Sequence, residues 1–225
     1  MKKNTTVKSS RKTPQWAAVG IDLGDRTSLV CGLDEKAQIV TEFKIPTTPE
    51  ALRAKFQRRP TQIALEAGPH AVWIEHLLTQ LGHTVTVANP RQLRLISHSA
   101  KKTDRADAIT LARLALCDAT LLSPIQVRDP QRQMHLTMVR ARAKIVAVRT
   151  ELLNSARGLV KPHGVRLPRR DASSPQALLA QGFPPDLQSA IHPMLVQVDT
   201  LSEQIKVYDQ QLAEIAATHY PETAK

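Results

Sequence analysis

Asp104 and Asp107 are the two residues whose types and spacing are best suited to metal chemistry in this sequence. They begin a segment with the apolar spacing of a helix, and residues three apart share one helical face, with Cβ atoms about 5–6 Å apart. Carboxylates this close repel each other, and a cation between them relieves the repulsion. A simpler interpretation also exists, because Thr103 is a good helix N-cap and acids in a first turn favour the helix dipole.

Two further acids occur where apolar segments end. Asp22 interrupts the apolar run 19–23, and Glu66 closes the run 62–66. A buried carboxylate is costly unless it is paired or bound to metal, although each acid could instead accept backbone N–H bonds at a strand end. If the fold gathers all four acids, they form a site for a divalent cation. The predicted metal ligands and catalytic residues are Asp22, Glu66, Asp104 and Asp107.

The elements that must position these acids follow from the apolar pattern. We expect strands at 16–23, 27–33, 38–45, 62–66 and 84–88, with helices at 49–58, 70–81, about 90–98, and from residue 103. Three closely spaced strands followed by crossover helices predict an α/β fold of the ribonuclease H-like type, with a mixed sheet and flanking helices. Sites in open sheets of this kind form outside the carboxyl ends of strands.

Composition favours a nucleic-acid partner. The 225 residues carry a formal net charge of +11, which suggests a polyanion, with an anionic membrane surface as the second choice. Aromatic residues make up only 3%, so an extended base-stacking surface is not expected. No apolar run is long enough to span a membrane, and residues 1–15 are predicted to be a disordered basic tail. Cys31 and Cys117 are expected to be buried thiols of a reducing compartment.

Residues 128–225 are predicted to form a helical, coiled-coil-like extension after a first domain at 16–127. Residues 128–170 contain eleven basic residues and two acids, and apolar residues recur every seventh position from Val139 to Val160. This pattern predicts one long helix with a basic face, ending near Lys161. After a loop or hairpin connection at 164–185, a heptad seam runs over 191–215, where Pro193 starts or kinks the helix. The seam could pack within the chain or against another subunit.

Several blocks of the sequence together resemble the DEDD transposases of the 110 family of bacterial insertion sequences, which are related to the Piv-type DNA invertases. The resemblance covers the chain from about Trp16 and rests on Val19–Leu23, Leu65–Gly68, Val87–Gln92, Lys102–Ala108, Leu136–Arg142 and Arg149–Asn154. Gly24 and Asp25 stand where the family often has a small residue and a lysine. This departure affects local contacts only.

The resemblance implies a RuvC-like domain whose four acids bind Mg²⁺ or Mn²⁺, for DNA strand cleavage and transfer during transposition. It also implies a structured guide RNA and a separate C-terminal domain with a serine nucleophile. That domain is missing here, so a truncated protein is expected. We further expect a homo-oligomer formed through the helical region, and a cytoplasmic bacterial protein that joins the nucleoid when bound to DNA. The expected nucleic-acid contacts are Arg91, Lys101, Lys102, Arg105, Arg132, Arg140, Arg142, Lys144, Arg149 and Arg157.

Two other functions compete with this interpretation. Without its serine domain, the chain could be a catalytically inactive fragment that only binds nucleic acid or dimerises. An actin-like ATPase is a third class, because Gly20–Gly24 is similar to the opening phosphate loop of that superfamily. The ATPase would need a duplicated second half and another glycine-rich loop, and neither is visible in the sequence.

Overall fold

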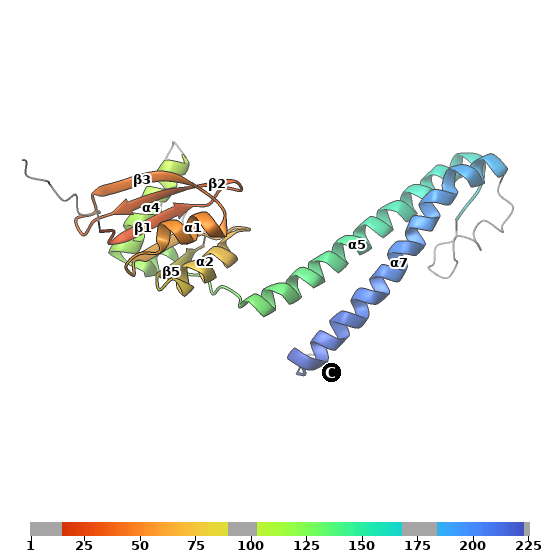
Figure 1. Cartoon of the computed structure of the whole chain (residues 1–225). Helices are drawn as coiled ribbons and strands as arrows, with labels where there is room; N and C mark the ends of the chain where they lie inside the picture. Colours follow the sequence, from red (N-terminus) through yellow and green to blue (C-terminus); the bar gives the residue numbers. More distant parts are fainter. Residues whose placement is uncertain (1–14, 90–102, 168–183, 223–225) are drawn as a thin grey trace, which may run out of the picture. The chain divides into compact units, whose positions relative to one another are not determined.

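The computed structural model describes residues 15–89, 103–167 and 184–222. The chain divides into two compact units, Met1–Arg128 and Asp129–Lys225, and each is described by itself. The first unit contains a sheet and its covering helices, and the second contains two long helices (Figure 1).

The sheet of the first unit has five strands in the order β3-β2-β1-β4-β5. Its strands are β1 (Ala18–Asp22), β2 (Thr27–Leu33), β3 (Ile39–Pro46), β4 (Gln62–Glu66) and β5 (Thr84–Ala88). The first three strands pair in antiparallel fashion, whereas β4 and β5 run parallel to β1. This mixed sheet with flanking helices is consistent with the ribonuclease H-like arrangement that the strand order predicts.

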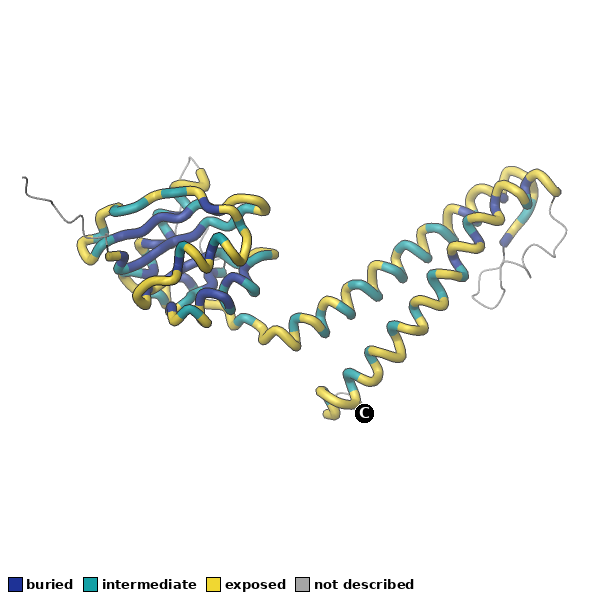
Figure 2. The backbone as a smooth tube through the Cα atoms, in the orientation of Figure 1, coloured by how far each residue is buried: buried dark blue, intermediate teal, exposed yellow. Residues whose placement is uncertain are grey.

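Helices cover both faces of the sheet (Figure 1). On one face, α1 (Pro49–Phe56) and α2 (Ala71–Gln80) enclose large side chains that include Ile21, Leu65 and Phe56. On the other face, α4 (Asp104–Cys117) packs on small residues such as Ala18 and Ala64. A short 3-10 helix, η1 (Ala119–Leu122), closes this second layer. Figure 2 shows the buried strands between their exposed connections.

The predicted elements of this unit agree with the structure to within a few residues. Thr48 and Thr103 cap α1 and α4 by accepting hydrogen bonds from Ala51 N and Ala106 N. Gly82 has φ +89°, as expected after the end of α2. The helix expected at 90–98 lies outside the described residues.

The two cysteines differ in burial, and one expectation was wrong. Cys31 lies in β2 beneath α4 and is fully buried. Cys117 is exposed, because it is the last residue of α4, where the chain turns away from the sheet. Burial raises the pKa of the Cys31 thiol, and the nearby Glu42 carboxylate raises it further.

The second unit is an antiparallel pair of helices. Asp129 caps α5 (Pro130–Val160), which is followed by the short 3-10 helix η2 (Lys161–His163) and then by α7 (Pro185–His219). The long helix ends at Val160, next to the predicted end near Lys161. The second begins at Pro185, because proline is favoured at a first helical position, and Pro193 lies inside it.

The two helices contact each other along their length, but their apolar seam is fully buried only near one end. Ala156 and Val160 of α5 pack there with Leu187, Ile191 and Leu195 of α7. Seam positions nearer the other end are half-buried, as the alternation of colours in Figure 2 shows. A coiled coil stays a prediction.

Val139 does not belong to the inward-facing stripe, contrary to expectation. Its side chain is 47% exposed, whereas Met138 and Arg142 on either side are half-buried. An exact seven-residue repeat drifts around a straight helix, so the predicted stripe rotates away from the partner helix over successive turns.

None of the helices in the described part of the chain is both long enough and apolar enough to span a membrane.

Candidate metal and nucleic-acid sites

Asp22 and Glu66 end two neighbouring parallel strands. The register pairs Ile21 of β1 with Leu65 of β4, so these acids are the next residues of each strand at the carboxyl edge. Neighbouring strands lie about 4.8 Å apart. Both acids are half-buried. The structure therefore places two of the four predicted ligand residues next to each other on adjacent strands.

The strand partners of these acids show which face they occupy. Asp22 pairs with Leu29, and Glu66 pairs with Ala88. Leu29 and Ala88 both pack in the apolar clusters beneath α4. Because paired residues point to the same side of a sheet, Asp22 and Glu66 lie on the face that α4 covers.

Gly20 determines how closely α4 approaches this face. A Cβ atom at Gly20 would overlap the carbonyl oxygen of Ala108 and the amide nitrogen of Ala112. Ala18, two residues earlier in β1, packs instead in the cluster that contains Leu111 and Ala115. The helix thus runs antiparallel to β1, and its N-terminal turn lies towards the carboxyl edge of the sheet.

Asp104 and Asp107 occupy that N-terminal turn. Asp104 is the first residue of α4 and is exposed, and Asp107 is half-buried. The backbone amide of Asp107 donates to the carbonyl of Thr103 at 3.0 Å. All four predicted ligand residues therefore come from backbone positions at one edge of the first unit. Among the residues that the structure describes, however, no three or more His, Cys, Asp or Glu side chains are grouped closely enough to hold a metal ion.

Arg105, which is predicted to contact nucleic acid, forms an ion pair that connects α4 to the sheet. Its Nε donates to Glu42 Oε1 of β3 at 2.6 Å. The hydrogen bond from Arg105 lowers the pKa of the Glu42 carboxyl, and the charge of the guanidinium lowers it further. Because Arg105 lies between Asp104 and Asp107, this ion pair positions the turn that carries both acids. Glu42 was not identified from the sequence, because nothing in its spacing links β3 to α4.

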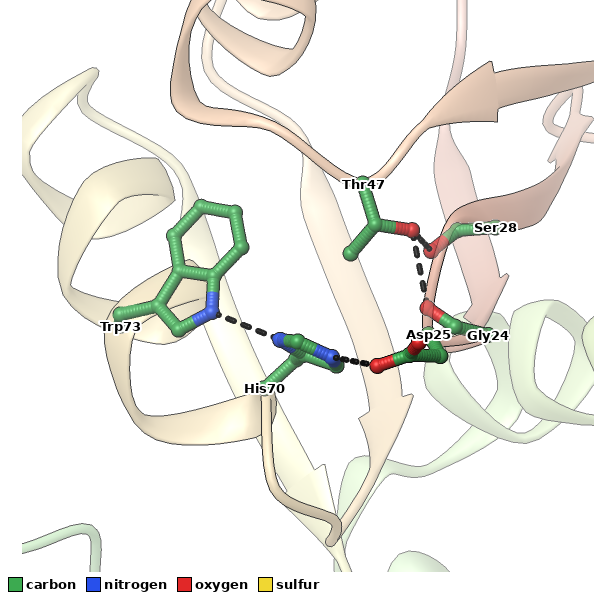
Figure 3. Close-up of polar contacts among 6 residues, drawn as sticks. All are labelled: Gly24, Asp25, Ser28, Thr47, His70 and Trp73. Carbon is green, nitrogen blue, oxygen red and sulfur yellow. Dashed lines mark hydrogen bonds and ion pairs between the residues drawn. The ribbon is translucent and has the colours of Figure 1, made fainter.

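A second polar cluster joins the loops that follow the other two acids (Figure 3). Trp73 Nε1 donates to His70 Nδ1 at 3.1 Å, so His70 carries its proton on Nε2, which lies 3.3 Å from Asp25 Oδ1. Asp25 follows Asp22 by three residues, and His70 follows Glu66 by four. Thr47 donates to the Gly24 carbonyl at 2.9 Å.

This cluster was missed because a lone histidine gives no spacing signal. The unusual Gly24 and Asp25 pair was the one clue, and the structure shows the local contact that Asp25 makes. The position of Gly20 argues against the ATPase hypothesis. It is buried against α4, so its backbone is not available to cradle a phosphate.

The basic residues predicted on α5 fall into two groups. Four of them contact acidic or polar partners: Arg132 with Asp129 at 3.1 Å, Arg142 with Asp209 at 2.7 Å, Arg149 with Ser202 at 2.6 Å and Arg157 with Asn154 at 3.3 Å. Arg140 and Lys144 are exposed on the helix, and Arg157 is half-buried. Arg91, Lys101 and Lys102 lie outside the described residues.

Comparison with known proteins identifies the class of protein to which this chain is similar. A family model described as a transposase, that of the DEDD transposases of the 110 family of insertion sequences, matches residues 19–163. The match covers more than half of the chain, from β1 through η2 and including all four acids. The chain belongs to this transposase family.

A curated relative supports the assignment. A probable family 20 transposase of Pseudomonas aeruginosa is 26% identical over 201 residues, which cover 88% of this chain. The aligned region is 57% of the length of that protein, so the chain spans little more than half of the relative.

Proposed function

We propose that the first unit is the RuvC-like nuclease part of a DNA transposase, and that its four acids bind a divalent cation, Mg²⁺ or Mn²⁺. The observation that carries the proposal is the close approach of α4 to Gly20. It brings the turn with Asp104 and Asp107 to the edge where Asp22 and Glu66 end their strands.

The donor set fits such a cation. Carboxylate oxygens are the ligands that Mg²⁺ prefers, and it retains several of its waters, so one or two carboxylates bound directly are sufficient. To reach one cation together, the four side chains must change their rotamers, whereas the backbone can stay where it is. A cation bound there would stabilise the charge that develops on a scissile phosphate and orient the attacking oxygen.

The chain's own residues supply the arrangement of this site. Arg105 and Glu42 hold the first turn of α4 against β3. His70 and Asp25 connect the turn after Asp22 with the loop after Glu66. In this proposal the four carboxylates are the residues that bind the cation, and the cation contacts the substrate phosphate.

Nucleic acid is the proposed partner of the second unit as well. Arg140 and Lys144 are exposed on α5, where they can contact backbone phosphates without reading the base sequence. We assign the same role to Arg91, Lys101 and Lys102, and a secondary one to the α5 arginines that already have partners. The proposal also includes selection of DNA sites with a structured guide RNA, homo-oligomerisation through α5 and α7, and a place at the bacterial nucleoid.

The competing function is an inactive fragment that binds nucleic acid or dimerises. We expect little or no strand cleavage by this chain alone, so cleavage cannot be the sole test.

The dependence of DNA affinity on metal separates the two functions. Fluorescence anisotropy with labelled duplex DNA should show that Mg²⁺ or Mn²⁺ tightens binding by the wild-type chain, because the cation connects the carboxylates to a phosphate. Asp104→Asn should remove this response. Glu35→Gln makes the same charge change in the exposed turn between β2 and β3, at the other edge of the sheet, and should retain it. If Mg²⁺ affects wild type and Asp104→Asn alike, the nuclease assignment is rejected.

A further inference from the structure

We propose that a basic cavity at the hairpin end of the second unit binds a phosphodiester of a nucleic-acid backbone. The cavity has a volume of about 990 Å³ and is lined by Arg157, Lys161 and Arg166, together with Asn154 and backbone of the turn at Gly164. Among the described residues that line it, three have cationic side chains and none is acidic. The inference extends the nucleic-acid role proposed above to a defined site.

The turn after α5 brings these cations together. Gly164 has φ +74°, a conformation that glycine adopts without strain, and its amide donates to the carbonyl of Lys161 at 3.0 Å. The chain then folds back, so that Val165 N donates to the carbonyl of Val160 at 3.4 Å. Arg166 therefore lines the same cavity as Arg157, although the two are nine positions apart in the sequence.

The cavity adjoins the best-packed part of the second unit through Leu167, which lines it. Ala156, Val160 and Leu167 are buried and pack with Leu187 and Ile191 of α7. Elsewhere the seam is only half-buried, so this end offers a more rigid base than the rest of the helix pair. Rigid support reduces the side-chain entropy lost when a ligand binds.

The chemistry of the lining selects a phosphate. Three cations held near one another repel, and an anion placed among them relieves that repulsion. Arg157 Nη1 donates to Asn154 Oδ1 at 3.3 Å, which helps to orient a planar guanidinium suited to two phosphate oxygens. None of the lining residues that the structure describes is aromatic, so the cavity is expected to contact phosphate and sugar, independently of base sequence.

The test compares two sets of substitutions with the same change in charge on the full chain. The cavity variant carries Arg157→Gln, Lys161→Gln and Arg166→Gln. The control variant carries Lys36→Gln, Lys44→Gln and Arg53→Gln, three exposed positions of the first unit that are not proposed to contact nucleic acid. Binding is measured by anisotropy with labelled single-stranded DNA and RNA 20-mers in EDTA, so the result does not depend on the metal site.

The cavity variant should lose about tenfold or more in affinity and reduce the salt dependence by one or two phosphate contacts. The control should lose clearly less. A probe with neutral methylphosphonate linkages should bind wild type weakly and no longer distinguish the two variants. Preference for the RNA or the DNA probe identifies the source of the phosphodiester, and either preference supports the site.

Equal losses of affinity in the two variants would overturn the proposal that the cavity is a binding site, and would indicate a diffuse basic surface. Circular dichroism establishes that both variants keep their helices, and the single variant Lys161→Gln, at an exposed position, provides a second measurement if the triple variant unfolds. Because the assay contains EDTA, rejection of the cavity leaves the metal-site proposal standing. Conversely, loss of the Mg²⁺ response in the DNA assay would not affect this result.

Discussion

Gly20 of β1 lies against the carbonyl oxygen of Ala108 in α4, with no room for a side chain between strand and helix. This contact sets the height of α4 above the sheet. It also fixes how far the turn with Asp104 and Asp107 lies from the ends of β1 and β4. The proposed metal site therefore depends on a residue that supplies no ligand atom.

Gly20→Ala should destabilise the first unit and weaken metal binding, because the added Cβ forces α4 away from the sheet. Overpacking of this kind costs about 1–3 kcal/mol, which corresponds to a fall in melting temperature of about 5 °C or more for a domain of this size. Thermal unfolding followed by circular dichroism measures the change. Gly68→Ala is the matched control, because nothing lies within 4 Å of a Cβ at that position. Equal melting temperatures for Gly20→Ala and wild type would show that α4 does not need this close approach.

The Glu42–Arg105 ion pair should give the first unit a pH dependence at acidic pH. The pKa of Glu42 is lowered in the folded chain, first by the hydrogen bond from Arg105. Its contribution to stability is therefore present above the ordinary pKa of Glu, about 4.3, and is lost as the pH falls through the lower folded value. In a carbon-13 NMR titration of the Glu42 carboxyl, Arg105→Gln should move the pKa upwards towards that ordinary value. An unchanged pKa in the variant would mean that the pair does not form in solution.

His70 should hold together the loops that follow Asp22 and Glu66. His70→Ala removes the partner of Asp25 and the acceptor for Trp73 Nε1, so the turn at Gly24–Arg26 should open more often. A loss of about 1 kcal/mol of local stability corresponds to about fivefold faster amide hydrogen exchange in that turn. His76→Ala serves as the control, because His76 contacts the carbonyl of Val72 within α2. Similar exchange rates in the two variants would show that His70 does not stabilise this turn.

Asp199 of α7 should destabilise the helix pair at neutral pH. Burial raises its pKa in the folded chain, and the nearby Glu203 carboxylate raises it further. A raised pKa means that ionisation is disfavoured on folding, so stability falls as the pH rises through the folded value. Asp199→Asn should therefore raise the melting temperature slightly at pH 7, with a difference that shrinks below the ordinary Asp pKa of about 3.9. Asp209→Asn, which breaks the contact with Arg142, should lower the melting temperature at pH 7.

Much of the fold could be predicted because its signals are local. The strands 27–33, 62–66 and 84–88 have the predicted bounds, since each is a short apolar run between turn residues. Helix caps at Thr48 and Thr103 are local as well. The start of α7 was harder to predict, because Pro185 begins this helix well before its heptad seam.

The candidate site could be predicted only in part. The four acids stood out because each lies at the start or end of an element. Glu42, His70 and Asp25 did not, because their roles come from contacts between residues as far apart as 63 positions in the chain. Arg105 was predicted from its charge to contact nucleic acid, and its ion pair with Glu42 was not foreseen, because that contact depends on how α4 packs beside β3.

Isothermal titration calorimetry with Mn²⁺ tests the central claim most directly. The wild-type chain and Glu35→Gln should bind the cation with the same affinity and stoichiometry. Asp22→Asn and Asp104→Asn, which change acids from opposite ends of the sequence of the first unit, should each weaken binding at least tenfold while the variants stay folded. Undiminished Mn²⁺ binding by either variant would contradict the claim that these carboxylates share one metal site.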